Sequence, residues 1–449
     1  MLAEQQYIEL FQKYRSEIDS HASSLMNEER AFSFDFFAKK GFPNQRDEDF
    51  LHINLEKQFS NDYGMNLKAV DFKVDPYKFF RCTVPGINSH MFFVINDQFY
   101  PNVQLKYELP QGVIAGSLRE MSKKYPELIR SYYNKLAKNT TDTTVHFNTA
   151  FAQDGFFLYV PKGVVVEKTI QLVNMMYGGV DMMANSRNLI VIEEGASAKL
   201  LVCGHAMEER SYLANRVTEV FVGKGAKYDH YKLENTNEKM TNVGSLFVSQ
   251  DQESEVVISE ITLQNGLTRN NVVVNLDGEY SSVVLGGMAI NDCHQHTDTH
   301  TIINHNQPNC SSKELYKYVL DGEATGAFDG RILVKKDAQK TSAHQTNRNI
   351  CLNKKAKMYT KPHLEIYADD VSCSHGATVG QLDDLAVFYL RSRGISEVEA
   401  KMLLMFAFVN DVEELIRVPA LQDTIRLLVE KRFRGELNKK CEGCSSHCK

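Results

Sequence analysis

The sequence lacks the short motifs by which most enzyme families are identified. It contains no G-x-x-x-x-G-K-[ST] phosphate loop and no G-x-G-x-x-G dinucleotide fingerprint. It also contains no G-x-S-x-G nucleophile elbow and no H-E-x-x-H zinc motif. The sequence therefore gives no sign of ATPase, hydrolase or metalloprotease chemistry, and we expect a protein that is not an enzyme.

Long apolar runs are absent too. No stretch of 18 consecutive apolar residues occurs, and a membrane-spanning helix needs a stretch of about that length. The first residues, MLAEQQYIELF, carry acids where a signal peptide would carry basic and then apolar residues. We therefore expect a cytoplasmic protein with no membrane segment, whose nine cysteines are reduced thiols.

The chain also has no strong excess of charge. Its net charge is −6 over 449 residues, which gives no electrostatic reason to expect a nucleic-acid partner. Hydrophobic residues make up 43% of the chain, enough for a sizeable core.

The hydrophobic pattern divides the chain into four regions. Residues 1–139 mix helical stretches, such as EQQYIELFQKYRSEI, with extended pieces. In residues 140–392, β-branched and aromatic runs alternate with short turns that resemble one another, among them PKGV, EEGA, GKGA and two copies of LDGE. Residues 393–437 turn helical again, and residues 438–449 form a cysteine-rich tail.

The similar turns of the second region predict a solenoid. The first three turns lie about 30 residues apart, a period typical of repeat architectures. Because no helical pattern separates the strands, a parallel β-helix is favoured over a sheet of βαβ units. A β-sandwich built from hairpins is the alternative. We predict a mostly β fold with helical ends, in which the β-helix lies between N-terminal and C-terminal helical regions.

Two segments inside the strand-rich region carry metal-binding side chains. If residues 293–305, CHQHTDTHTIINH, form a strand, then His294, His296, Asp298 and His300 share one face. An ordinary solvated sheet face is the favoured interpretation there, since a metal site also needs ordered outer partners.

The second segment is CSHG, in which Cys373 and His375 share one face if the chain is extended. Thiolate and imidazole are good ligands for iron and zinc, but a tetrahedral metal needs four ligands. The pair is therefore either structural or half of a site that another chain completes.

The C-terminal regions offer two further candidates. The tail places Cys441, Cys444, His447 and Cys448 in a C-x-x-C-x-x-H-C pattern, which binds a metal or forms a disordered, oxidisable end. In the helical region Ser396 and Glu399 fit a capping box. The apolar residues after it either belong to the core or form a docking face for another protein; they are Met402, Leu403 and Phe406.

Three stretches resemble a known family. Residues 328–408, from FDGRILVKKDAQ to MLLMFAF, closely resemble the SufB/SufD family of iron–sulfur cluster assembly proteins. Within them, ADDVSCSHGATVGQLD is similar to the SufD form, whereas SufB typically carries a Glu-His-Glu-Ala version. HTDTHTIINHNQPNCSSKELYK also resembles the family, and GFPNQRDEDFLHINL, residues 41–55, resembles the SufD entry motif. Phe50 stands where Trp is usual in that motif, and the chain contains no Trp.

The resemblance implies a right-handed parallel β-helix that pairs with a SufB-like protein. It implies that a nascent cluster is built at that junction, with His375 opposite a SufB cysteine and Cys373 beside it. It also implies that a SufC-like ATPase docks on the C-terminal helical region, where Met402, Leu403 and Phe406 lie. A transient Fe–S cluster or iron is expected at the SufB interface, and no cofactor tightly bound by the isolated chain. Whether the isolated chain forms a homodimer stays open.

The expected mechanism is mechanical. Dimerisation of the ATPase on ATP pulls on the C-terminal helices, and a stiff β-helix transmits that movement to the junction. One alternative is a β-helix polysaccharide lyase or hydrolase, which the missing signal peptide and the helical ends disfavour. The other alternative is a SufB-type protein that holds a cluster alone.

Overall fold

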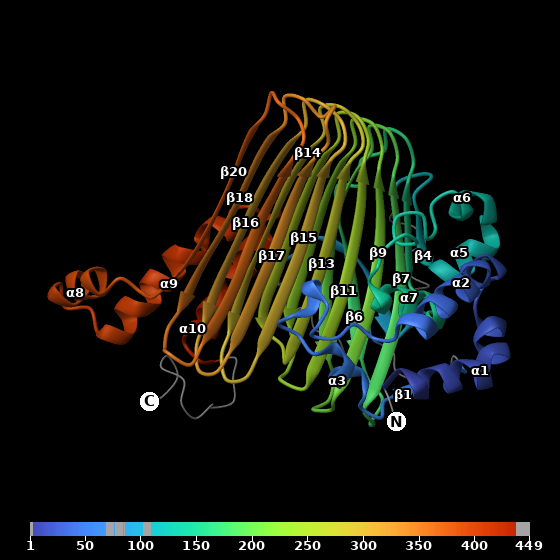
Figure 1. The fold of residues 1–449 in the computed structure, drawn as a ribbon, viewed down its shortest axis with the longest axis horizontal. Helices are drawn as coiled ribbons and strands as arrows, with labels where there is room; N and C mark the ends of the chain where they lie inside the picture. Colours follow the sequence, from blue (N-terminus) through green and yellow to red (C-terminus); the bar gives the residue numbers. More distant parts are fainter. Residues whose placement is uncertain (1–2, 69–75, 77–83, 85, 102–108, 437–449) are drawn as a thin grey trace.

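The computed structural model describes residues 3–68, 76, 84, 86–101 and 109–436 (Figure 1). Successive strands from β5 onward alternate between two sheets, so each coil of the chain contributes one strand to each sheet. Sheet A runs in the order β4 (Ile114–Ser117), β5 (Phe156–Val160), β7 (Met182–Ile192), β9 (Tyr212–Val222), β11 (Met240–Gln250), β13 (Leu267–Leu276), β15 (His296–His305), β17 (Thr325–Val334) and β19 (Lys357–Ile366), and β1 (Gly64–Met65) pairs with β7. Sheet B runs in the order β3 (Gln98–Tyr100), β2 (Ser89–Ile95), β6 (Thr169–Met176), β8 (Ser197–Ala206), β10 (Lys227–Asn235), β12 (Glu255–Gln264), β14 (Ser282–Asn291), β16 (Ser311–Leu320), β18 (Ser342–Cys351) and β20 (Ser372–Gly380).

The register of the strands shows a parallel solenoid of about eight coils. From β5 and β6 onward every pairing is parallel, and paired residues are 26 to 32 positions apart in the sequence. Four of the turns that resemble one another have a glycine with positive φ, a conformation that glycine adopts at no steric cost; these are Gly163, Gly195, Gly225 and Gly322. The predicted parallel β-helix with helical ends is therefore confirmed.

The interior of this rod is filled by side chains from both sheets. Alternate residues of each strand point inward and form one apolar cluster, which includes Ile190 and Val220 of sheet A and Leu200 and Ile258 of sheet B. A closely packed interior of this kind makes the rod stiff along its axis.

Helices cover the outer faces of both sheets. The N-terminal helices pack over sheet A, where α1 (Ala3–His21), α2 (Ser24–Lys40), α3 (Leu55–Phe59) and α7 (Thr143–Phe151) bury aromatic side chains against β7, β9 and β11. The 3-10 turn η1 (Glu48–Phe50) and the short helices α5 (Leu118–Lys124) and α6 (Pro126–Arg130) complete this part. On the other side, α9 (Glu397–Glu413) and α10 (Pro419–Phe433) pack over sheet B. No helix of the described ranges is long and apolar enough to cross a membrane.

The C-terminal limit of the rod differs from the expected boundary at residue 392. Strand β20 ends at Gly380, and α8 (Asp384–Ser392) begins four residues later, capped by the Asp383 side chain, which accepts a hydrogen bond from the Leu385 backbone N–H. The apolar run in DDLAVFYLRS is as compatible with a strand as with a short helix. Figure 1 shows α8 projecting beyond the β20 end of the rod.

Candidate functional site

The last coil of the rod has an open edge. Strand β20 pairs with β18, and no other strand of the described residues lies on its far side; the same holds for β19 beyond β17. Large apolar side chains are exposed there, among them Tyr367 (64%) and Val379 (48%). An unpaired strand edge with exposed apolar side chains is a template for pairing with another chain.

Cys373 and His375 lie on this open strand, on the side that faces the interior of the rod. Cys373 is half-buried and packs against the interior cluster, and this burial raises the pKa of its thiol. His375 has the same orientation along the strand but is exposed, because no further coil covers it. The two side chains thus lie together at the mouth of the rod, as the pattern in CSHG indicates.

The described residues do not complete a metal site around this pair. Among them one group of three candidate residues has its donor atoms within 4.8 Å of one another, and it consists of Glu238, Asp292 and Cys293, in another part of the rod. Cys293 is disulfide-bonded, so it offers no thiolate to a metal. Cys373 and His375 therefore offer two possible donor atoms at an open edge, fewer than the four that a tetrahedral metal needs.

A row of polar side chains lies directly behind His375. The register pairs His375 with Gln345 in β18 and Gln345 with Glu314 in β16. Gln345 Nε2 donates to Glu314 Oε2 at 2.7 Å, and Thr301 Oγ1 donates to Glu314 Oε1 at 2.5 Å. Burial raises the pKa of the Glu314 carboxyl to about 7. The sequence pattern does not reveal Gln345 or Glu314 as neighbours of His375, because the partner of a residue in the next coil depends on the length of each intervening turn.

The histidine-rich segment forms β15 from His296 onward, and His294 lies in the preceding turn with an exposed side chain. Asp298 forms a buried ion pair with Arg269 at 2.9 Å. His300 Nε2 lies 3.4 Å from Asp298 Oδ1, and burial lowers the pKa of His300 well below its usual value. On this face Asp298 is buried and His296 and His300 are half-buried, and Phe50 of the N-terminal region lies over Arg269, so the face is less solvated than expected.

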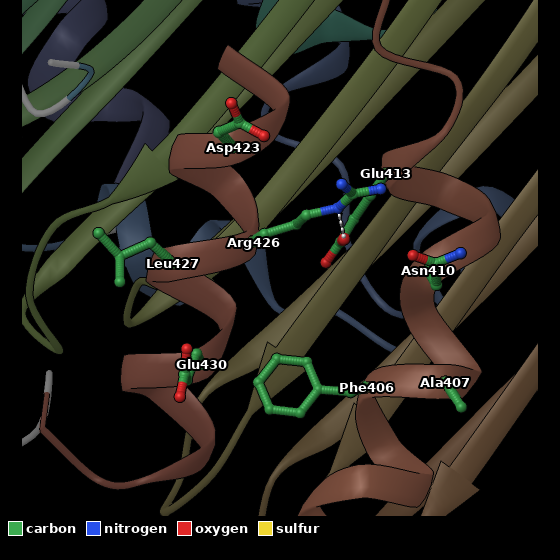
Figure 2. Close-up of a pocket in the computed structure, with 8 residues that line it drawn as sticks. All are labelled: Phe406, Ala407, Asn410, Glu413, Asp423, Arg426, Leu427 and Glu430. Atoms are coloured by element: carbon green, nitrogen blue, oxygen red, sulfur yellow. Dashed lines mark hydrogen bonds and ion pairs between the residues drawn. The ribbon is translucent and has the colours of Figure 1, made fainter. Parts of the chain in front are cut away.

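The three expected docking residues have different environments. Met402 is 5% exposed and belongs to the apolar cluster between sheet B and the C-terminal helices, whereas Leu403 is 42% exposed. Phe406 lines a groove of about 620 Å³ between α9 and α10 (Figure 2). An ion pair between Arg426 and Glu413, 3.2 Å long, bridges the two helices at this groove (Figure 2).

Helix α8 carries apolar residues that fall within the range expected for the rod, residues 140–392. Leu385, Phe388 and Tyr389 are 78%, 68% and 55% exposed, and Val398 at the start of α9 is 63% exposed. Ser396 caps α9 by accepting from the Glu399 backbone N–H at 3.2 Å, as the predicted capping box requires. Together α8 and the first turn of α9 form an apolar surface, which we call the α8–α9 surface.

The cysteines outside β20 do not extend the site. Cys203, Cys310 and Cys351 are free thiols, whereas Cys293 is disulfide-bonded, which corrects the expectation of nine reduced cysteines. The tail residues Cys441, Cys444, His447 and Cys448 lie outside the described residues.

Comparison with known proteins identifies the family. The description "SUF system FeS cluster assembly, SufBD core domain" matches residues 175–408, and "SufBD protein N-terminal region" matches residues 1–172. A SufBD family protein of Synechocystis is 27% identical over 437 residues, 94% of each chain. SufD of Escherichia coli is 29% identical over 294 residues, 65% of this chain and 70% of the relative. SufD of Bacillus subtilis is 24% identical over 349 residues, 76% and 79% of the two chains. The chain therefore belongs to the SufBD family of iron–sulfur cluster assembly proteins.

Proposed function

We propose that this chain is a SufD-type scaffold subunit that joins a SufB-like protein at the β20 edge and contributes His375 to a nascent cluster there. The open edge is the observation that carries the proposal, since it places an exposed imidazole and a half-buried thiol where another chain can pair. The cluster is cargo in this account, and the chain works without a catalytic constellation of its own. In the absence of SufB the same edge is free to pair with a second copy.

The exposure of His375 fits a role as a ligand that completes a partner's site. A neutral imidazole offers a nitrogen lone pair to iron, and soft thiolates supplied across the junction suit the same metal. The raised pKa of the Cys373 thiol keeps it protonated near neutral pH, so His375 is the stronger donor of the pair in the isolated chain.

The α8–α9 surface and the groove in Figure 2 are the proposed docking area for a SufC-like ATPase. Leu403 and Phe406 remain accessible to a partner, whereas the burial of Met402 assigns it to the core. Exposed aromatic and aliphatic side chains such as Phe388 and Leu385 are the residue types that anchor protein interfaces.

Firm contacts between the C-terminal helices and sheet B support coupling of ATPase movement to the junction. Lys317 of β16, whose side chain is 3% exposed, donates to the Phe408 carbonyl at 2.6 Å and pairs with Asp411 at 2.7 Å, both in α9. Gly286 of β14 allows close approach, since a Cβ there would lie 2.4 Å from a methyl carbon of Leu415. A force on α9 therefore acts directly on β16, which lies two strands from β20.

The direct test is His375→Ala in the reconstituted complex with SufB and SufC. Cluster output, measured as transfer to an apo-ferredoxin, should fall by about tenfold or more because the complex loses a ligand. His344→Ala is the matched control: His344 is exposed on the outer face of the neighbouring strand, where its Nδ1 lies 2.8 Å from Ser374 Oγ. Unchanged output from His375→Ala, with the complex intact by size-exclusion chromatography, removes His375 from the site.

A further inference from the structure

The amide of Gln345 is held in one orientation. An ionised carboxylate only accepts hydrogen bonds, so Glu314 in its ionised form fixes the Nε2 end of the amide toward the inside of the rod at 2.7 Å. Thr301 of sheet A holds the other carboxylate oxygen, so Glu314 is itself fixed from both sheets. The opposite end of the amide, Oε1, must then point away from Glu314.

The backbone around this amide is shaped to admit it. A Cβ on Gly330 would lie 2.3 Å from Gln345 Nε2, so glycine is needed for the amide to occupy its position. Gln345 and Glu314 are each 1% exposed in the rod. A buried, closely fitted polar pair of this kind requires an explanation, because burying such groups is costly unless every hydrogen bond is made.

One hydrogen bond is missing from this set. Gln345 Oε1 is buried and accepts no hydrogen bond from any residue that the structure describes. The next residue in the row is His375, paired in register with Gln345 and on the same side of the sheet, one strand spacing of about 4.8 Å away. An imidazole always carries at least one N–H, so His375 can supply the donor that this oxygen lacks.

We infer that Gln345 is a positioning residue for His375: its Oε1 accepts the imidazole N–H, and Glu314 sets the direction of the amide. The role of this hydrogen bond in metal binding rests on the proposed function, whereas the hydrogen bond itself does not depend on it. A hydrogen bond to one ring nitrogen fixes the tautomer, so the other nitrogen presents its lone pair outward, toward a metal held by the partner. Because burial raises the pKa of Glu314 to about 7, this orientation of the amide is enforced above that pH, where the carboxyl is ionised and can only accept.

The tautomer of His375 tests this inference directly. The full chain is labelled with ring-¹⁵N histidine, and long-range ¹H–¹⁵N spectra are recorded at about pH 8.5, where Glu314 is ionised, with the His375 signal assigned by its loss in His375→Asn. In the unmodified chain His375 should populate one tautomer. In Gln345→Met, which keeps the side-chain volume but removes the acceptor, the ratio should move to that of a solvent-exposed histidine.

Glu314→Gln provides a second, independent variant. An amide at position 314 both donates and accepts, so Gln345 is free to reverse and His375 should show a mixture of tautomers. Asn347→Leu is the matched control, because Asn347 lies on the same strand and face, is equally buried, and pairs with Ala377 instead of His375. It should leave the His375 tautomer unchanged.

The outcomes separate this inference from the proposed function. A tautomer ratio in the unmodified chain equal to that of exposed histidine, or no change in Gln345→Met and Glu314→Gln, overturns the inference. Cluster output that is insensitive to His375→Ala refutes the proposed role of the imidazole, while the tautomer measurement still decides whether Gln345 orients it.

Discussion

Removing Arg432 should detach the C-terminal helices from the rod. Arg432, near the end of α10, is 1% exposed and donates to both carboxylate oxygens of Asp292, at 2.8 and 2.9 Å, as well as to Gln295 Oε1 at 2.9 Å. In Arg432→Met the apolar stem is retained, but Asp292 is left as a buried carboxylate without its guanidinium. Breaking a buried pair by removing one partner costs about 3–5 kcal/mol.

The small change in Tm expected for Arg432→Met determines which assay is suitable. Unfolding entropy of about 2.1 cal/mol/K per residue gives roughly 0.9 kcal/mol/K for the whole chain, so a loss of that size lowers the Tm by only about 3–5 °C if unfolding is fully cooperative. Local release of α9 and α10 is the more sensitive readout, since their protection from proteolysis depends on this anchor. We expect cleavage within α10 in Arg432→Met under conditions that leave the parent chain intact.

Two further variants make the reasoning refutable. Arg432→Met combined with Asp292→Leu should regain most of the lost stability, because replacing both partners by apolar groups removes the uncompensated charge. Arg434→Met, two residues along, removes an exposed ion pair with Glu430 and should cost less than about 1 kcal/mol. Arg432 is not the anchor if Arg432→Met is no more sensitive to protease than Arg434→Met, or if the double variant is less stable than the single one.

Three other predictions test the rod and its surfaces. Burial raises the folded-state pKa of Glu314 from 4.5 to about 7, so the stability that its protonation contributes is greatest below pH 4.5 and is lost as the pH rises through 7. From pH 5 to pH 8 the parent chain should therefore lose about 2 kcal/mol of unfolding free energy relative to Glu314→Gln, measured by urea unfolding. Equal pH dependence of the two chains would contradict this prediction. Gly330→Ala should destabilise the fold by about 1–3 kcal/mol, because the added Cβ would lie 2.3 Å from the buried Gln345 amide. Gly376→Ala at the open end is the control and should be neutral, since no atom lies within 4 Å of its Cβ. Similar Tm values for the two variants would show that the interior rearranges to accept the methyl group. Phe388→Asp should weaken binding of a SufC-like ATPase by about 30-fold or more while leaving the Tm unchanged. Val165→Asp, at an exposed position near the other end of the rod, is the control and should not weaken binding. Equal affinities in calorimetric titration would exclude the α8–α9 surface as the docking site.

Much of the fold was predictable because the pattern that specifies it is local and recurs in every coil. Each coil carries its own alternating strands and its own turn, so similar turns such as EEGA and GKGA indicate the architecture without knowledge of any long-range contact. The CSHG pair was predictable for the same reason, since two residues on one strand share a face whatever surrounds them. Neither pattern shows which strand forms the end of the rod.

The sequence by itself determined the solenoid, the helical ends, the family and the position of Cys373 and His375 on one face of a strand. Only the tertiary structure decided which residues lie behind His375, because coil lengths vary from 26 to 32 residues and a miscount of one reverses the face of every side chain. Only the tertiary structure decided that Met402 is buried and Phe388 exposed, since burial depends on the sheet that a helix covers and not on the helix alone. The physical reason is that periodicity fixes the direction of a side chain relative to its own strand or helix, whereas its neighbours are set by how distant parts of the chain pack.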